Sequence, residues 1–158
     1  YVLAIVLTTA LLGIGVAGVD HVATVRSEAQ VERQLAEIES AVTALRDTEE
    51  LTPPGQPGAR RVVELDLPAD RFASRRATTL RLQPDPRGIT TIEYRVGDRM
   101  TRTKHVEAIV RNRETATGTT DLSGRTGRVT LALSLVAARA DSENDTAAHV
   151  ALAVRDGG

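Results

Sequence analysis

The first nineteen residues carry no charged side chain, and no later part of the chain resembles them. As an α-helix rising about 1.5 Å per residue, this stretch reaches about 28 Å, close to the thickness of the hydrocarbon core of a bilayer. Its polar side chains are those of Tyr1, Thr8 and Thr9, and the first charged residue is Asp20. The sequence therefore predicts an apolar helix, residues 1–19, that leads into a water-soluble domain.

The helical pattern continues beyond this stretch, but its apolar residues now occupy one face only. They recur at spacings of four, three, four and three, which places them on a single stripe of a helix. They are Val31, Leu35, Ile38, Val42 and Leu45. No proline precedes Pro53, so one helix can run from near Tyr1 to about Asp47, roughly 70 Å in length. We expect residues 20–50 to form an amphipathic continuation whose stripe packs on the rest of the chain.

A segment rich in proline and glycine, residues 51–59, ends the predicted helix and forms a linker. Residues 60–158 are expected to form an antiparallel β head of about six strands, which makes the fold class α+β. The strands are expected at 61–67, 77–83, 88–96, 99–110, 128–136 and 149–155. Parallel pairing is not expected, because no crossover helix is visible.

The connections between these strands carry turn and loop signals. Tight turns are expected at 84–88 and at Gly97-Asp98. Residues 111–127 are expected to form a long exposed loop, and residues 138–147 a polar excursion between the last two strands. These signals favour a meander of hairpins.

Charge is distributed unevenly along the chain, although the net charge is only −1. Residues 20–50 contain eight acidic and three basic residues, whereas residues 60–128 contain fifteen basic and nine acidic ones. We expect the acidic helix and the basic sheet to attract each other, either within one molecule or between neighbours.

The residues that could carry chemistry do not combine into a known active site. Cysteine is absent, which excludes disulfides and thiolate ligands. The histidines His21, His105 and His149 lie far apart and lack other ligands at metal-binding spacing. No nucleophile elbow, phosphate loop, metalloprotease or dinucleotide motif occurs in its required context. We therefore expect no enzymatic activity, catalytic residue, metal or cofactor.

Two surface features raise the question of a partner or a modification. The arginines of the head could attract nucleic acid, but sheet-based readers usually add aromatic platforms, and only Phe72 and Tyr94 are available. We expect no nucleic-acid partner. Asn144 begins an Asn-Asp-Thr triplet in the polar excursion, which makes it a candidate N-glycosylation site.

Three interpretations of the apolar segment compete. A cleaved secretory signal would carry a basic region before its apolar core, and no such basic region is seen here. A single-pass anchor explains the length and would leave the head as a monomeric extracytoplasmic module. A polymerising subunit explains in addition why the helix continues as an amphipathic half with a β head built against it.

An uncharged N-terminal segment, one continuous helix and a β head together resemble the type IV pilin superfamily, most of all archaeal, haloarchaeal-looking pilins and pilin-like proteins. The resemblance covers the layout of the whole chain and is specific over residues 1–45. It implies that a prepilin peptidase cuts a membrane-embedded precursor just before Tyr1. It also implies that pilus assembly machinery then builds an extracellular filament of identical subunits on the cell surface, in roles such as adhesion.

The same resemblance assigns the N-terminal residues to an assembly helix in the filament core, with the heads outside. This set comprises Tyr1, Leu3, Ile5, Val6, Leu7, Leu11, Leu12, Gly13, Ile14, Val16, Ala17 and Gly18. Its small residues would let neighbouring helices approach closely. One position departs from the bacterial pattern, because Ile5 stands where bacterial pilins carry a glutamate; archaeal members often lack that glutamate. The single-pass anchor that does not polymerise stays open as the alternative.

Overall fold

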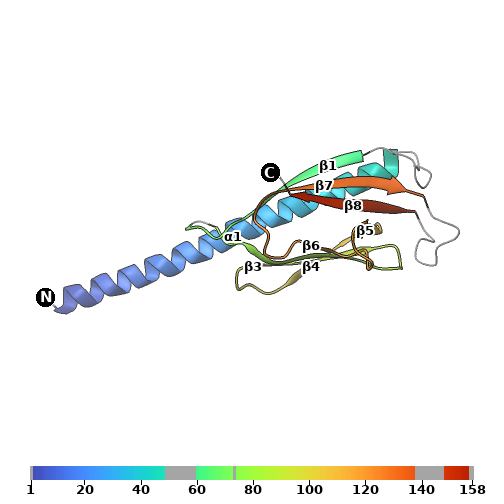
Figure 1. Ribbon diagram of the computed structural model, residues 1–158. Coiled ribbons are helices and arrows are strands. Elements are labelled where there is room, and N and C mark those ends of the chain that lie inside the picture. Colours follow the sequence, from blue (N-terminus) through green and yellow to red (C-terminus); the bar gives the residue numbers. More distant parts are fainter. Residues whose placement is uncertain (1, 49–59, 73, 138–147, 157–158) are drawn as a thin grey trace.

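The structure, a computed structural model, describes residues 2–48, 60–72, 74–137 and 148–156, and for residues 2–4, 7–17, 48 and 156 it describes the backbone alone. Within these ranges one helix, α1 (Val2–Thr48), precedes all the strands. Its 47 residues correspond to about 70 Å. Figure 1 shows that the N-terminal part of α1 projects as a straight rod, whereas its C-terminal part lies against the strands. The predicted continuous helix is confirmed, and the predicted linker at 51–59 lies outside the described residues.

Eight strands follow the helix within the described residues. They are β1 (Arg60–Leu67), β2 (Ala77–Pro84), β3 (Thr90–Val96), β4 (Arg102–Val106), β5 (Val110–Asn112), β6 (Thr120–Asp121), β7 (Gly127–Val136) and β8 (His149–Asp156). They form two four-stranded sheets, ordered β1-β7-β8-β5 and β4-β3-β2-β6. The α+β class is confirmed, but the prediction of one antiparallel sheet of about six strands is wrong.

One extra strand arises because the segment expected as a single strand at 99–110 changes sheet. The chain leaves β4 at Val106 and enters the other sheet as β5 at Val110. Buried Thr90 holds this crossing, because its hydroxyl donates to the Ala108 carbonyl at 2.7 Å and accepts from the Val110 N–H at 2.8 Å. A threonine on a neighbouring strand therefore supplies the hydrogen bonds that a strand break would otherwise leave unmade.

The second extra strand lies in residues 111–127, which were expected to form an exposed loop. That prediction is wrong, because β6 pairs with β2 and Leu122 is completely buried. The Leu122 N–H donates to the Leu80 carbonyl at 2.8 Å, and the Leu80 N–H donates to the Ser123 hydroxyl at 3.1 Å. This segment therefore covers the edge of β2 and contributes to the core.

The pairing of β5 with β8 is parallel, and the prediction that parallel pairing is absent is wrong. After β5 the chain crosses to the second sheet as β6 and returns to the first as β7, so that β8 runs alongside β5 in the same direction. The connection through β6 of the opposite sheet and β7 of the same sheet thus replaces the crossover helix of a βαβ unit.

Both predicted tight turns are confirmed. At 84–88 the Asp85 N–H donates to the Ile89 carbonyl at 2.8 Å, and Gly88 has a φ of +98°. At the second turn the Arg99 N–H donates to the Val96 carbonyl at 3.2 Å. Gly97 has a φ of +55°, which only glycine adopts without strain, so this residue type sets the direction in which β4 leaves β3.

The C-terminal part of α1 packs on both sheets through its apolar stripe. Val31, Leu35, Ile38, Val42 and Leu45 are each 1% exposed or less. They share one core cluster with the inward-facing leucines and valines of both sheets. Burying a side chain of this size contributes about 1.5–3 kcal/mol, so the stripe is a major part of the stability of the head.

Two glutamines of α1 also cover the edge of β1. The Gln30 side-chain amide donates to the Asp66 carbonyl at 2.6 Å, and the Gln34 side-chain oxygen accepts from the Asp66 N–H at 2.8 Å. Since β1 is an edge strand, these backbone groups would otherwise be free to pair with another chain. The helix therefore protects one open side of the two-sheet head.

Candidate functional site

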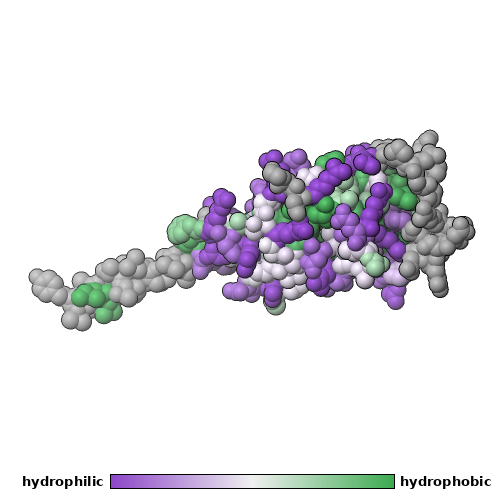
Figure 2. Space-filling view, viewed as in Figure 1, coloured by the Kyte–Doolittle hydropathy of each residue, from purple (hydrophilic) through white to green (hydrophobic). Residues whose placement is uncertain are grey.

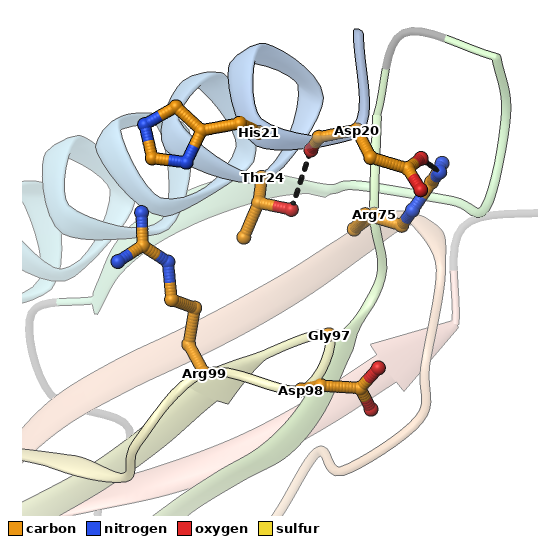
Figure 3. Close-up of a pocket in the computed structure, with 7 residues that line it drawn as sticks. All are labelled: Asp20, His21, Thr24, Arg75, Gly97, Asp98 and Arg99. Carbon is orange, nitrogen blue, oxygen red and sulfur yellow. Dashed lines mark hydrogen bonds and ion pairs between the residues drawn. The ribbon is translucent and has the colours of Figure 1, made fainter. Parts of the chain in front are cut away.

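The candidate site is the neck, which we define as residues 18–28 of α1 together with the loop residues 68–72, 74–76 and 97–101. A hollow of about 290 Å³ lies there between the helix and the loops. Figure 3 shows helix side chains on one side of it and the β3–β4 turn, from which Arg99 rises toward the helix, on the other. Its lining residues are Asp20, His21, Thr24, Arg75, Gly97, Asp98 and Arg99.

Arg75 ties the helix to the loop at this hollow. Its guanidinium forms an ion pair with the Asp20 carboxylate, and it donates to the carbonyls of Arg71 at 2.7 Å and Ser74 at 3.0 Å. The backbone N–H of Arg75 donates to the hydroxyl of buried Ser27 at 2.8 Å. These bonds hold the point at which α1 leaves the head, so the direction of the rod is set by the head itself.

Further ion pairs follow the helix along β3 and β4. Arg102 contacts Glu28 at 2.8 Å and Glu32 at 3.0 Å, and Lys104 contacts Glu39 at 2.7 Å. The Tyr94 hydroxyl donates to Glu32 at 3.0 Å, and burial together with this bond raises the pKa of Tyr94. The predicted attraction between the acidic helix and the basic sheet therefore operates within one molecule.

Large apolar side chains at the neck remain exposed. They come from α1 and from the two loops that contribute Arg75 and Arg99 to the hollow, and they are 36% to 87% exposed. We call them the neck patch: Val19, Val22, Val25, Phe72 and Met100. Figure 2 shows hydrophobic surface where the rod meets the head. These residues lie at the level where the rod meets the head, which makes this level a candidate contact surface.

The chain was compared with known families, curated proteins and solved structures. Residues 1–151 match a family model described as a domain of unknown function, DUF7311. The chain belongs to the DUF7311 family. The match runs through the rod, the neck and nearly all of the head, so the family includes all three parts. No curated protein and no solved structure matches the chain.

Several of the residues expected in the assembly helix can be located in the DUF7311 chain. Ile5 and Val6 are 66% and 61% exposed on the rod. Gly18 is exposed as well, and a Cβ built on it would meet no atom within 4 Å. For the other members of the set only the backbone of α1 is described, apart from Tyr1, which lies outside the described residues together with Asn144. Their assignment to a filament core stays a prediction.

Judged on the residues that are described, no helix of the DUF7311 chain has the length and apolarity needed to cross a membrane. The three histidines lie apart, with His21 on α1, His105 on β4 and His149 on β8. Across the described residues, no three acidic or histidine side chains gather where they could hold a metal ion.

Sequence reasoning missed the neck patch in the DUF7311 chain. The available signal on the helix was the spacing of three between Val19, Val22 and Val25 in a stretch that otherwise turns polar. Phe72 and Met100 carried a weaker signal, since each is a single large apolar residue in an arginine-rich loop. Only the fold brings these loops to the base of the rod.

Proposed function

We propose that this chain is the structural subunit of a type IV pilus-like surface filament. In this proposal the rod polymerises into the filament core, and the β heads form the outer surface. The observation that carries it is one continuous helix of which one part is buried in the head and the other projects from it. The resemblance to archaeal type IV pilins supports the same assembly and implies a prepilin peptidase and assembly machinery as partners.

The projecting part of α1 requires a cover. The sequence of residues 2–19 is apolar all round, and Ile5 and Val6 are exposed. Leaving apolar surface in water costs about 25 cal/mol per Å², so the rod needs either lipid or other helices around it. Lipid covers it before assembly in this proposal, and copies of the same rod cover it afterwards. The two environments are similarly apolar, so exchange between them is feasible.

The neck patch favours copies of the chain over lipid as the final cover. Val22 and Val25 lie beyond Asp20, and Asp20 pairs with Arg75 at the hollow. Lipid is a poor cover for this level of the molecule, because the charged pair needs water or polar partners. A neighbouring subunit can cover the valines and the charged pair together, because protein interfaces combine apolar and polar contacts. A rod that contacts the neck of another copy makes a heterologous interface, and such an interface extends into a filament when it does not close.

The runner-up is a single-pass anchored protein that does not polymerise. It accounts for the exposed rod as well as the filament does, because lipid alone would cover residues 1–19. It gives no role to Val22 and Val25 on the helix surface above the anchor. The two proposals therefore differ in what they expect of the neck.

Electron microscopy of purified native material, combined with N-terminal sequencing, tests the proposal. Filaments whose subunits begin at Tyr1 support it, and a detergent-soluble monomer favours the anchor. Val22→Asp on the neck is the diagnostic variant, because it should prevent filaments without disturbing the core. Val62→Asp is the matched control, since Val62 is also exposed but lies on the outer face of β1. If both variants form normal filaments, the neck is not a subunit contact.

A further inference from the structure

The outer face of the sheet β1-β7-β8-β5 carries a second hollow, of about 100 Å³. None of the residues given for its lining belongs to the neck. Its floor is made of small side chains from β7 and β8, namely Ala132, Ser134 and Ala153. Three arginines surround the floor: Arg60 from β1, Arg113 from the segment after β5, and Arg155 from β8. We call this the arginine hollow.

Strand register places Arg60 and Arg155 on the same outer face of the sheet, on either side of β7. Arg60 lies opposite Ser134, and Arg155 lies opposite Thr130 on the same strand, β7. Both side chains lie on the face opposite the buried leucines of β7, because alternate residues of a strand point to opposite faces. Small residues between them leave space above the sheet, into which long side chains can extend.

Arg113 closes the third side of the arginine hollow. Its backbone N–H donates to the Leu152 carbonyl at 3.0 Å, and its guanidinium donates to the Ser134 hydroxyl at 2.6 Å. This bond carries the side chain across β8, which lies between β5 and β7 in the sheet. A fixed guanidinium with further N–H groups is therefore present at the rim.

The three guanidinium groups at this hollow have no carboxylate partner among the described residues, unlike several other arginines of the head. Elsewhere the guanidinium groups of Arg75, Arg81 and Arg102 each contact a carboxylate. Of the side chains that the structure describes around the arginine hollow, none is acidic. Among the described residues, neither Arg60 nor Arg155 has an ion pair, and Arg113 bonds a neutral hydroxyl. Like charges that converge on one space raise the energy of the free protein, and an anion placed between them lowers it.

We propose that the arginine hollow binds a tetrahedral oxyanion, a sulfate or phosphate group, either free or at the end of a larger anionic molecule. Guanidinium groups match such oxygens with paired N–H donors. The hollow, of about 100 Å³, has room for one such group. The inference does not rest on the proposed filament, because the hollow belongs to the head of a single subunit.

Calorimetric titration of the full chain in non-ionic detergent, in phosphate-free buffer of low ionic strength, tests the proposal with sodium sulfate and sodium phosphate as probes. We expect saturable binding at one site, and Arg60→Gln or Arg155→Gln should each weaken it about tenfold, as the loss of one charge-assisted contact predicts. The double variant should show no saturable binding. Arg87→Gln is the matched control, because Arg87 is an exposed arginine in the turn between β2 and β3.

Thermal melts without added anion separate binding from folding. Removing one of three converging charges should leave the melting temperature of Arg60→Gln and Arg155→Gln equal to or above that of the parent chain. Sulfate should then raise the melting temperature of the parent chain and of Arg87→Gln, but not of the double variant. If sulfate does not bind saturably, or if the double variant binds it as tightly as the parent chain, the proposal is wrong.

A polymer probe distinguishes the two sources of the oxyanion. Dextran sulfate is compared with neutral dextran on the parent chain, the double variant and Arg87→Gln. Weaker binding of dextran sulfate by the double variant alone supports an oxyanion carried on a larger molecule. Equal binding by all three chains, together with saturable binding of sulfate by the parent, supports the free ion as the ligand.

Discussion

The two parts of α1 belong to one continuous helix but have opposite surroundings. From Ala23 onward one face of the helix is buried, and its flanking polar residues bond to β1, β3 and β4. Before Ala23 the described side chains are exposed, with Asp20 held by Arg75 at the base of the rod. Helix formation is common to both parts, so it does not determine what each part contacts. The pattern of polarity does, because an amphipathic helix can be covered on one side by a single head and an apolar helix cannot.

The comparison also explains how the head can stay folded while the rod changes its environment. The core contains the stripe that ends at Leu45 and contains no described residue of the rod before Ala23. The helix is fixed to the head at the neck through Arg75, and directly beyond the neck through Arg102 and the Asp66 backbone. Substitutions before the neck should therefore affect assembly, and substitutions after it should affect stability.

The largest expected effect is the loss of filaments on substitution within the rod. Leu11→Asp places a charge in the apolar segment, and Gly13→Leu fills a position where helices could approach closely, so we expect either to abolish filaments. The thermal melt of the full chain in detergent should change little, by less than about 0.5 kcal/mol in unfolding free energy. Electron microscopy and circular dichroism measure the two outcomes. Normal filaments from Leu11→Asp would refute the core-helix assignment.

The reverse outcome is expected for the packed part of the same helix. Ile38 is completely buried, so Ile38→Ala should lower the free energy of unfolding by about 2–5 kcal/mol through lost burial and a cavity. Ala36→Ser, on the exposed side of the helix two residues away, should change it by less than about 0.5 kcal/mol. Urea denaturation followed by circular dichroism gives both values. A small effect of Ile38→Ala would mean that the helix is not part of the core.

A smaller effect should separate two ion pairs of the packed part. The Glu28 side chain is 11% exposed, so Arg102→Gln leaves a largely buried carboxylate without its cation and should cost about 1–2 kcal/mol. Lys104→Gln removes a pair whose Glu39 is well exposed and should cost about 0–0.5 kcal/mol. Urea denaturation of both variants at the same salt concentration measures the difference. Equal losses would show that burial of Glu28 contributes nothing.

Much of the fold could be predicted where the signal is local. The spacing of Val31, Leu35 and Ile38 predicted the buried stripe, and glycine at Gly97 predicted the turn. The change of sheet at 107–109 could not be predicted, because it depends on the Thr90 hydroxyl, which lies on another strand. The neck and the arginine hollow escaped prediction for the same reason. The neck draws its residues from three segments of the chain and the arginine hollow from four, and only the folded structure brings those segments together.

The smallest expected effect concerns the sheet edge that α1 does not cover. Here β6 covers β2, and Asp121 lies opposite Arg81 with an ion pair of 2.8 Å. Hydrogen bonds from Ser123 and from Arg81 lower the pKa of Asp121 to about 2, against partial burial, which raises it. A lowered pKa of Asp121 in the folded state stabilises the protein at pH values above the usual pKa of 3.8, and this contribution disappears as the pH falls through about 2.

Because the pair is half exposed, Asp121→Asn should cost at most about 1 kcal/mol of unfolding free energy near pH 6. Urea denaturation at several pH values should show the variant and the parent chain converging between pH 4 and pH 2. A difference that persists below pH 2 would mean that the Asp121 side chain stabilises β6 through its shape and not through its charge.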